Sequence, residues 1–280
     1  MNFNLLDKIS SKYKDYKIEK INREASKRIF YRLIKDSNSF ICLDSSNEKK
    51  EYKNFLKVYT YLSKVNVSIP VIYENDDDNN ILILEDFGNL RFDRILKDYP
   101  LRNLLEYAVK TLTILKNDID YNNSQDLSVY NYDTFKSEIS EFHDFYYPYI
   151  HNKKISKGLI EEFYGCWKTY FNSINFDFRS FVHKDFNINN LMYLPNRKNH
   201  LKCGVLDFQN AFLGENCWDL FSLLEDSRVM FNNEFNNYFL EYYYKNSKQK
   251  FSFNEFKKKY YFLSSSRQSR LLGRWIKLSI

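Results

Sequence analysis

The chain has 280 residues, 44% of them hydrophobic, which is enough to bury a sizeable core as one large domain or as two lobes. Its 42 basic and 36 acidic residues give a net charge of +6 spread along the chain, a mild excess that suits an anionic ligand as well as nucleic acid. Four scattered cysteines, without a CxxC pair or a histidine at metal-ligand spacing, argue against a zinc site and a disulfide framework.

Nothing in the sequence is typical of export or of a membrane anchor. The N-terminal stretch MNFNLLDKISSKYKDYK lacks the apolar core of a signal peptide. The longest apolar stretches, such as residues 81–84, are far shorter than a membrane span. We therefore expect a soluble cytoplasmic protein that binds no membrane; the sequence leaves its oligomeric state open, with a monomer as the expectation.

The first third of the chain predicts a small mixed α and β region. Residues 29–33 and 40–43 are rich in β-forming side chains and flank the turn-forming sequence KDSNS, which predicts an antiparallel hairpin. Apolar positions at helical spacing predict a helix over residues 48–64. A second strand pair is expected at 71–73 and 81–84, around the acidic turn ENDDDNN.

After the sequence EDFG the pattern becomes mainly helical. Residues 101–115, 135–149 and 159–174 predict helices with aromatic faces, and only residues 181–208 interrupt them. We place a lobe boundary near Glu85 to Gly88. The expected fold class is therefore α+β, with a small lobe at residues 1–85 and a larger, mostly helical lobe at residues 86–280.

The stretch FVHKDFNINNLMYL, residues 181–194, carries the chemistry that we can interpret. A strand at 190–194, a polar loop and a return strand at 203–208 predict a hairpin in which Asn190 lies across from Asp207. Their carboxamide and carboxylate oxygens are ligands that Mg²⁺ accepts together with phosphates and water. Asp185, on the loop entering the hairpin, is then placed to face an acceptor hydroxyl.

Phosphoryl transfer needs this division of labour, because one carboxylate orients the nucleophile while metal and cations neutralise the transferred group. Asp185 and Asn190 could instead be turn-forming residues that bond their own backbone, although that interpretation does not explain Asp207. His183 could brace the loop or transfer a proton.

These motifs resemble the aminoglycoside phosphotransferase-like kinases, and more closely the bacterial N-acetylmuramate/N-acetylglucosamine anomeric kinases. HKDFNINNLM is similar to HRDYHSRNLM of that group, and GVLDFQNA to its GVLDFQDA. The segments EASKRIFYRL, ILILEDFG, CWDLFSLLEDS and RQSRLLG extend the resemblance, in order, over nearly the whole chain. The sequence ends in LLGRWIKLSI, at a point where the resembled proteins continue, so it is either a trimmed form or lacks a C-terminal cap.

The resemblance implies a protein kinase-like two-lobed fold that uses ATP and Mg²⁺, with nucleotide in the small lobe and the acceptor in the large one. It makes Asp185 the catalytic base, with His183 beside it, and Asn190 and Asp207 the magnesium ligands. The residues implied in nucleotide binding are Ser26, Arg28, Arg32, Glu85 and Asp86. Those implied in acceptor binding are Asn187, Gln209 and Asp219, of which Asp219 could instead buttress the catalytic loop.

Two departures from the kinase pattern concern the nucleotide site. The strand FICLD lacks the lysine that usually holds the phosphates, and we propose Arg28 or Arg32 as the substitute cation. Strand alternation puts Phe30 and Arg32 on one face, so Arg32 either points into the cleft or is a solvated surface residue. The turn NREAS also lacks a glycine, which restricts how closely its backbone approaches phosphates.

We therefore expect a kinase that phosphorylates the anomeric hydroxyl of a small amino sugar salvaged from cell wall, with no nucleic-acid partner. An aminoglycoside kinase would need an acidic acceptor pocket, for which Glu138, Glu141 and Asp144 are few. A choline-type kinase would need an aromatic cage, which the 19% aromatic content allows. A nucleotide-binding pseudokinase would explain the missing lysine and glycine. Nucleic-acid binding lacks a basic stripe on any one element.

Overall fold

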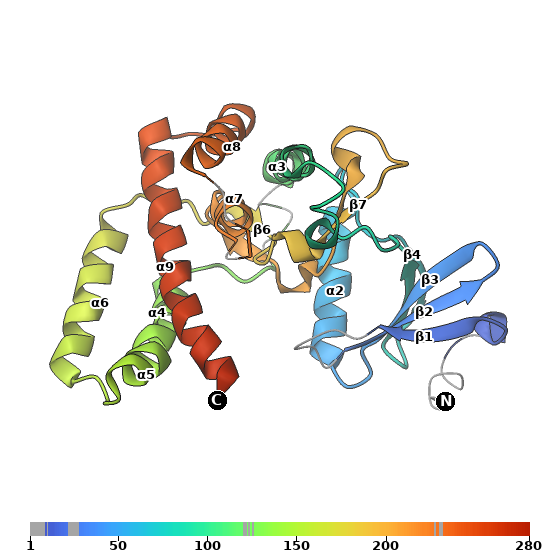
Figure 1. Cartoon of the computed structure of the whole chain (residues 1–280), viewed down its shortest axis with the longest axis horizontal. Helices are drawn as coiled ribbons and strands as arrows, with labels where there is room; N and C mark the ends of the chain where they lie inside the picture. Colours follow the sequence, from blue (N-terminus) through green and yellow to red (C-terminus); the bar gives the residue numbers. More distant parts are fainter. Residues whose placement is uncertain are drawn as a thin grey trace. The chain divides into compact units, whose positions relative to one another are not determined.

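The computed structural model describes residues 9, 11–21, 28–119, 122, 124, 126–226, 228–229 and 232–280. The chain divides into two compact units, drawn in Figure 1: unit 1 comprises Met1–Thr111 with Ile188–Asn210, and unit 2 comprises Leu112–Asn187 with Ala211–Ile280. Helix α3 (Leu101–Asp118) begins in unit 1 and ends in unit 2. Unit 1 thus includes residues 86–111 and 188–210, which lie beyond the boundary proposed from the sequence.

Unit 1 is built on a five-stranded antiparallel sheet with the order β1-β2-β3-β5-β4. The predicted hairpin is confirmed, because β2 pairs with β3 from Ile29 opposite Asp44 to Lys35 opposite Asn38. The second predicted strand pair is also confirmed, with a bulge between Ile72 and Glu74. The strands are β1 (Lys17–Ile21), β2 (Ile29–Lys35), β3 (Asn38–Asp44), β4 (Ile72–Asp76) and β5 (Ile81–Glu85).

The two faces of the sheet have different functions in the fold. Tyr31 and Leu33 lie in a buried cluster with residues of β3 and β5, whereas Phe30 and Arg32 line a cavity on the other face, as the alternation predicted. Helix α2 (Lys49–Leu62) confirms the predicted helix and buries Phe55, whose ring lies 4.7 Å from that of Phe208. Burying one such aromatic side chain is worth roughly 1.5–3 kcal/mol.

The predicted hairpin around residue 200 is present, with shorter strands. Strands β7 (Leu191–Tyr193) and β8 (Cys203–Val205) pair antiparallel, and the short helical turns η5 (Ile188–Asn190), η6 (Asn199–Lys202) and η7 (Phe208–Asn210) adjoin them. Another turn, η2 (Phe92–Arg94), also lies in unit 1. A Cβ atom on Gly204 would lie 2.7 Å from Phe87 Cε2, so the glycine lets the hairpin pack against the segment after β5.

Unit 2 is mainly helical, with one short antiparallel pair of strands, β6 (Ser180–Val182) and β9 (Phe212–Gly214). The predicted helix at 135–149 is observed as α4, a π-helical turn at Phe142–Tyr146 and α5, and the helix predicted at 159–174 is α6. The helices are α4 (Tyr132–Glu141), α5 (Tyr147–His151), α6 (Lys157–Asn172), α7 (Trp218–Leu224), α8 (Asn233–Asn246) and α9 (Phe253–Ser279).

Helix α9 organises the interior of unit 2. A capping box between Ser252 and Glu255 begins the helix, and the two side chains satisfy backbone N–H groups of its first turn. Farther along, Lys259 forms a buried ion pair with Glu215 at 3.1 Å.

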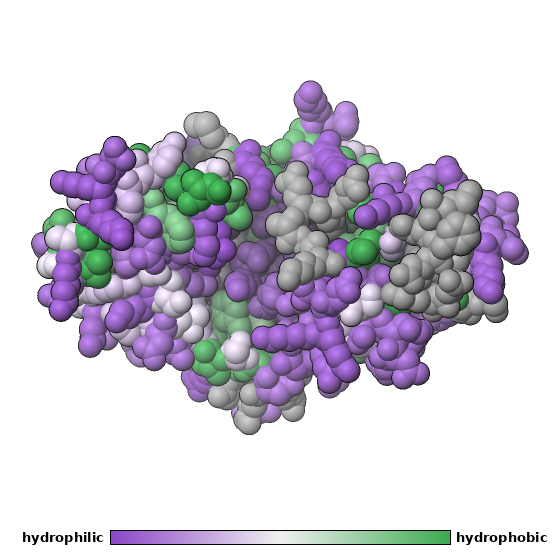
Figure 2. Space-filling model, turned by 90° about the horizontal axis from the view of Figure 1, so that it is seen from below, coloured by the Kyte–Doolittle hydropathy of each residue, from purple (hydrophilic) through white to green (hydrophobic). Residues whose placement is uncertain are grey.

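Hydrophilic residues cover most of the molecular face in Figure 2, with small hydrophobic patches among them. Among the residues described, no helix has the length and apolar character that crossing a membrane requires.

Candidate active site

A cavity of about 290 Å³ in unit 1 gathers most of the residues predicted to bind nucleotide. It is lined by side chains of β2, β3 and α2, by the segment that follows β5, and by the residues after β8. The predicted residues in its lining are Arg28, Arg32, Glu85, Asp86, Asp207 and Gln209. Ser26, the other predicted phosphate contact, lies outside the described residues.

Arg28 and Asp207, which both line this cavity, form an ion pair. Arg28 Nη2 donates to Asp207 Oδ1 at 2.8 Å, and the side chains are 7% and 26% exposed. Asp207 has a φ of 64°, in the left-handed region that side chains other than glycine rarely adopt. This backbone turn directs the carboxylate out of the strand ladder and toward Arg28.

The register predicted for the hairpin was wrong by one residue. Leu191 pairs with Val205, and the N–H of Leu206 donates to the carbonyl of Asn190 at 2.9 Å, so Asn190 lies opposite Leu206 and not opposite Asp207. The strands end at three residues because the turn η6 closes the loop and Asp207 leaves the extended conformation. Asn190 and Asp207 nevertheless remain at the same end of the hairpin.

The oxygen atoms around Asp207 are of the type that magnesium binds. Gln209 Nε2 donates to Asp207 Oδ1 at 3.2 Å, and Gln209 Oε1 is buried without a hydrogen-bond partner in the described part of the chain. No group of three or more His, Cys, Asp or Glu side chains among the described residues is arranged to hold a metal. A cation here would therefore need further oxygen ligands from phosphates and water, which is how magnesium is commonly held.

Arg32 is bound to the segment that follows β5. Its Nε lies 2.6 Å from Asp86 Oδ2, and its Nη atoms donate to the carbonyl of Gly88 at 3.0 Å and to Asn89 Oδ1 at 2.7 Å. The Asp86 side chain is only 3% exposed. Arg28 therefore pairs with Asp207, whereas Arg32 fixes the conformation of residues 86–89. Glu85 forms its own ion pair, with Arg197.

Asp219 holds the loop at residues 183–187 in unit 2. Its carboxylate, buried at the start of α7, accepts hydrogen bonds from the N–H groups of His183 at 2.8 Å and Lys184 at 3.0 Å. Lys184 has a φ of 85°, so the chain turns sharply here before Asp185. Burial raises the pKa of Asp219 to about 7, the two backbone hydrogen bonds oppose that rise, and the charge of Asp185 adds to it.

The remaining predicted loop residues of unit 2, His183 and Asn187, lie two positions before and after Asp185 in the chain. His183 is fully buried, and its ring meets the edge of Phe186 at 5.6 Å between centroids, a packing role in the loop. Asn187 is buried, and its N–H donates to the carbonyl of Asp185 at 3.0 Å. The Asp185 side chain stays half-buried, which leaves it accessible to a small acceptor.

Asp226 and Arg267 are buried charged residues of unit 2 that were not predicted from the sequence to belong to the site. The available signal was an arginine in the apolar face of a helix, because Arg267 follows Phe256, Tyr260 and Leu263 at helical spacing. The resemblance covers this arginine within the segment RQSRLLG but assigns it no role.

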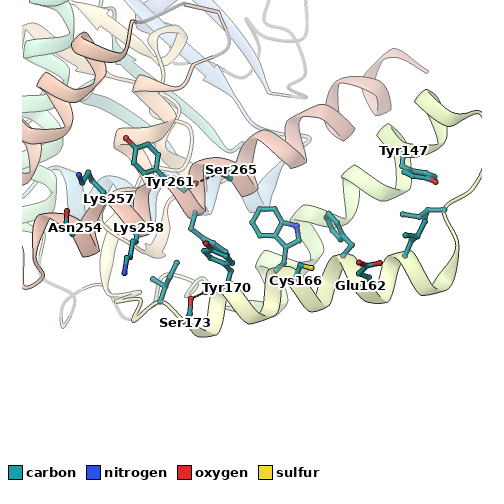
Figure 3. Close-up of a pocket in the computed structure, with 16 residues that line it drawn as sticks. Tyr147, Glu162, Cys166, Tyr170, Ser173, Asn254, Lys257, Lys258, Tyr261 and Ser265 are labelled. Atoms are coloured by element: carbon teal, nitrogen blue, oxygen red, sulfur yellow. Dashed lines mark hydrogen bonds between the residues drawn. The ribbon is translucent and has the colours of Figure 1, made fainter.

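A larger cavity, of about 1320 Å³, lies between α6 and α9 (Figure 3). Aromatic and aliphatic side chains such as Trp167, Tyr170 and Tyr261 dominate its lining, with Lys257 and Lys258 at one end. It includes none of the predicted site residues that the structure describes. Its lining therefore does not include the loop at residues 183–187.

Comparison with known proteins relates these features to a family. The model of the phosphotransferase enzyme family (APH) matches residues 166–251, which include the loop at residues 183–187, Asp207 and Asp219. The chain is 28% identical over 217 residues to an N-acetylmuramate/N-acetylglucosamine kinase of Neisseria meningitidis, covering 75% of this chain and 61% of that protein. A kinase of the same name from Pseudomonas aeruginosa is 28% identical over 211 residues, covering 74% and 59%. The chain thus spans about three fifths of the length of these relatives.

Solved structures show the same fold at low sequence identity. The ADP-bound aminoglycoside phosphotransferase APH(2'')-Ib has a TM-score of 0.64 and 16% identity, covering 96% of this chain and 86% of that one. The gentamicin complex of APH(2'')-IIa also has a TM-score of 0.64 and 16% identity, covering 100% and 97%. The chain therefore has the protein kinase-like fold of these structures, and its residues 166–251 match the model of the phosphotransferase enzyme family.

Proposed function

We propose that the chain is an ATP- and magnesium-dependent kinase that phosphorylates the anomeric hydroxyl of an amino sugar, N-acetylmuramate or N-acetylglucosamine or both. The observation that carries the proposal is the clamp of Asp219 on the two N–H groups directly before Asp185, within the segment that the family model matches. The sugar class follows from the names of the relatives.

Asp185 is the proposed catalytic base. A sugar's anomeric hydroxyl is more acidic than an ordinary alcohol, so a carboxylate need only take its proton late in a loose transition state. Base catalysis of this kind contributes roughly 10²–10⁴-fold. Most of the acceleration must come from alignment and from charge neutralisation.

The cavity of unit 1 is the proposed nucleotide site. Apolar side chains such as Phe30, Ile41 and Leu84 line it, which suits a flat purine, and the backbone of Glu85 to Phe87 offers hydrogen-bonding groups at its edge. Arg28 is the proposed phosphate cation in place of the missing lysine, because it is the basic residue paired with Asp207.

Asp207 and Asn190 would hold the magnesium ion, with Gln209 beside them. When bound, magnesium supplies positive charge that neutralises the phosphates of ATP. Arg28 donates a hydrogen bond to the Asp207 carboxylate in this structure. We expect Arg28 to move from this carboxylate to a phosphate when the nucleotide binds.

The test is ATP-dependent phosphorylation of an acceptor panel containing N-acetylmuramate, N-acetylglucosamine, kanamycin and choline, with the product identified by ³¹P NMR. Formation of a sugar 1-phosphate from either amino sugar supports the proposal. Turnover of kanamycin or choline alone would replace it with another phosphotransferase of the same fold. Binding of magnesium and ATP without any product would favour a pseudokinase.

A further inference from the structure

Arg267 is a buried cation of α9 with unused hydrogen-bond donors. It is 8% exposed, and its Nε and Nη1 atoms are buried with no hydrogen-bond partner in the part of the chain that the structure describes. A buried guanidinium with unused donors is costly, so it calls for a group that completes its hydrogen bonds, such as water, an ion or a ligand. Its neighbour one turn along α9, Arg270, differs because it pairs with Glu138 at 2.7 Å.

The charges around Arg267 come from several elements of unit 2. Burial lowers the pKa of Arg267, Arg270 and Arg228 act in the same direction, and the carboxylates of Asp185 and Asp226 oppose the shift. Arg267 therefore lies within electrostatic range of the proposed catalytic base.

Asp226 is a buried carboxylate of unit 2 that also has an unbonded atom. Its Oδ1 pairs with Arg228 at 3.0 Å, while its Oδ2 is buried without a hydrogen-bond partner among the described residues. Asp226 and Arg267 carry opposite charges and act on each other, yet they form no hydrogen bond. Two buried groups of opposite charge would normally pair, so Arg267 Nε, Arg267 Nη1 and Asp226 Oδ2 leave hydrogen-bonding capacity that a ligand would complete.

Hydrogen bonds hold these two residues in place. Gln268 Nε2 donates to the carbonyl of Glu225 at 3.0 Å, and the hydroxyl of Tyr260 donates to Glu225 Oε1 at 3.0 Å. The residues directly before Asp226 and directly after Arg267 are thereby tied together. Arg267 lies on the face of α9 that carries Tyr260 and Leu263, opposite Lys258 in the groove of Figure 3, so that groove is a different feature.

We propose that Arg267 binds the carboxylate of the acceptor sugar and that Asp226 Oδ2 accepts a hydrogen bond from one of its hydroxyl groups. The inference rests on the proposed function and names the residue that would select between its two sugars. N-acetylmuramate differs from N-acetylglucosamine by a lactyl ether on O3 that carries a carboxylate. With the anomeric hydroxyl at Asp185, this carboxylate projects from C3 of the sugar ring, and an unbonded N–H group of Arg267 would donate a charge-assisted hydrogen bond to it.

A purely structural role makes a different prediction. If Arg267 only compensated the charge of Asp185, its loss would lower turnover of every acceptor alike. If it binds the lactyl carboxylate, the loss falls on N-acetylmuramate. The ratio of kcat/KM for N-acetylmuramate to that for N-acetylglucosamine therefore separates the two roles.

The experiment compares the unmodified chain with Arg267→Gln, Arg267→Lys and the control Arg274→Gln, which removes a half-exposed arginine of α9 paired with Glu141. We expect the ratio to fall roughly ten- to hundredfold in Arg267→Gln, as for loss of a charged hydrogen bond, less in Arg267→Lys, and not in Arg274→Gln. Equal losses for both sugars, or an unchanged ratio, would overturn the assignment.

Calorimetric titration of each protein with both sugars gives a readout that needs no turnover. Tighter binding of N-acetylmuramate than of N-acetylglucosamine, lost in Arg267→Gln, supports the site even if neither sugar is phosphorylated, a result that would remove only the proposed function. Equal affinity of the unmodified chain for the two sugars, or no binding of N-acetylmuramate, overturns the inference. Should Arg267→Gln fail to fold, Arg267→Lys and the unmodified chain still decide it.

Discussion

Arg28 and Asp207 form an ion pair at 2.8 Å although 179 positions separate them in the sequence. The pair brings the cation directly before β2 to the carboxylate that is proposed to hold magnesium. The guanidinium of Arg28 balances the charge of that carboxylate while no metal is bound. The same cation is then available for the phosphates that arrive with the metal.

Replacing Arg28 with Gln tests this exchange. We expect kcat/KM for ATP to fall by roughly 10²–10³-fold, the usual consequence of removing a group that stabilises charge in the transition state. Steady-state kinetics with ATP as the varied substrate measures the effect. An unchanged kcat/KM would mean that another cation holds the phosphates.

Arg32 is the matched control for Arg28, since it lines the same cavity but is bound to Asp86. The substitution Arg32→Gln removes a partner of a buried carboxylate, so we expect it to lower the free energy of unfolding by about 1–3 kcal/mol. Its effect on kcat/KM for ATP should be smaller than that of Arg28→Gln. Urea denaturation and the same kinetic assay give both values, and a larger kinetic effect at Arg32 would reverse the assignment.

Asp219 predicts a dependence of stability on pH. Its pKa is raised to about 7 by burial, from an ordinary value of 3.8. Between about pH 4 and pH 7 the folded state thus binds more protons than the unfolded state, so this group makes stability fall as pH rises through that range. The variant Asp219→Asn should lack this part of the fall.

Urea denaturation of the unmodified chain and of Asp219→Asn at several pH values measures the difference. Asparagine offers one acceptor oxygen to the two N–H groups, which shifts the whole stability curve but does not change its slope. The difference between the two curves should therefore change across pH 4 to 7. Parallel curves would show that Asp219 does not titrate there.

Gly273 lies where the packing of unit 2 leaves no room for a side chain. A Cβ atom at this position of α9 would lie 1.9 Å from the carbonyl oxygen of Glu141, which is backbone and cannot rotate away. We expect Gly273→Ala to destabilise by about 1–3 kcal/mol or more. Gly165 is the control, because nothing lies within 4 Å of its Cβ position in α6, and Gly165→Ala should stabilise by about 0.5–1 kcal/mol. Thermal melting of both variants checks the contrast.

Local patterns accounted for much of the fold. The hairpin of β2 and β3, its alternation at Phe30 and Arg32, and helix α2 all depend on periodicity within one short segment. The register of β7 with β8 did not follow from symmetry about the loop, because it depends on the turn η6 and on the left-handed conformation of Asp207.

The site was predictable as a set of residue types but not as a set of contacts. The spacing of Asp185 and Asn190 and the later LDF sequence indicated phosphoryl transfer. Which arginine meets Asp207 depends on how β2 packs against a segment far along the chain, and no local pattern records that. Arg267 was missed for the same reason, since packing decides that its Nε and Nη1 atoms meet no hydrogen-bond partner among the described residues.

The central claim, that Asp185 takes a proton from an anomeric hydroxyl, is tested most directly by following N-acetylmuramate and ATP by ³¹P NMR with the unmodified chain and with Asp185→Asn. We predict a phosphate coupled to the hydrogen on C1 of the sugar, formed roughly 10²–10⁴-fold more slowly by the variant. Phosphate on another sugar hydroxyl, or equal rates for the two proteins, would contradict the claim.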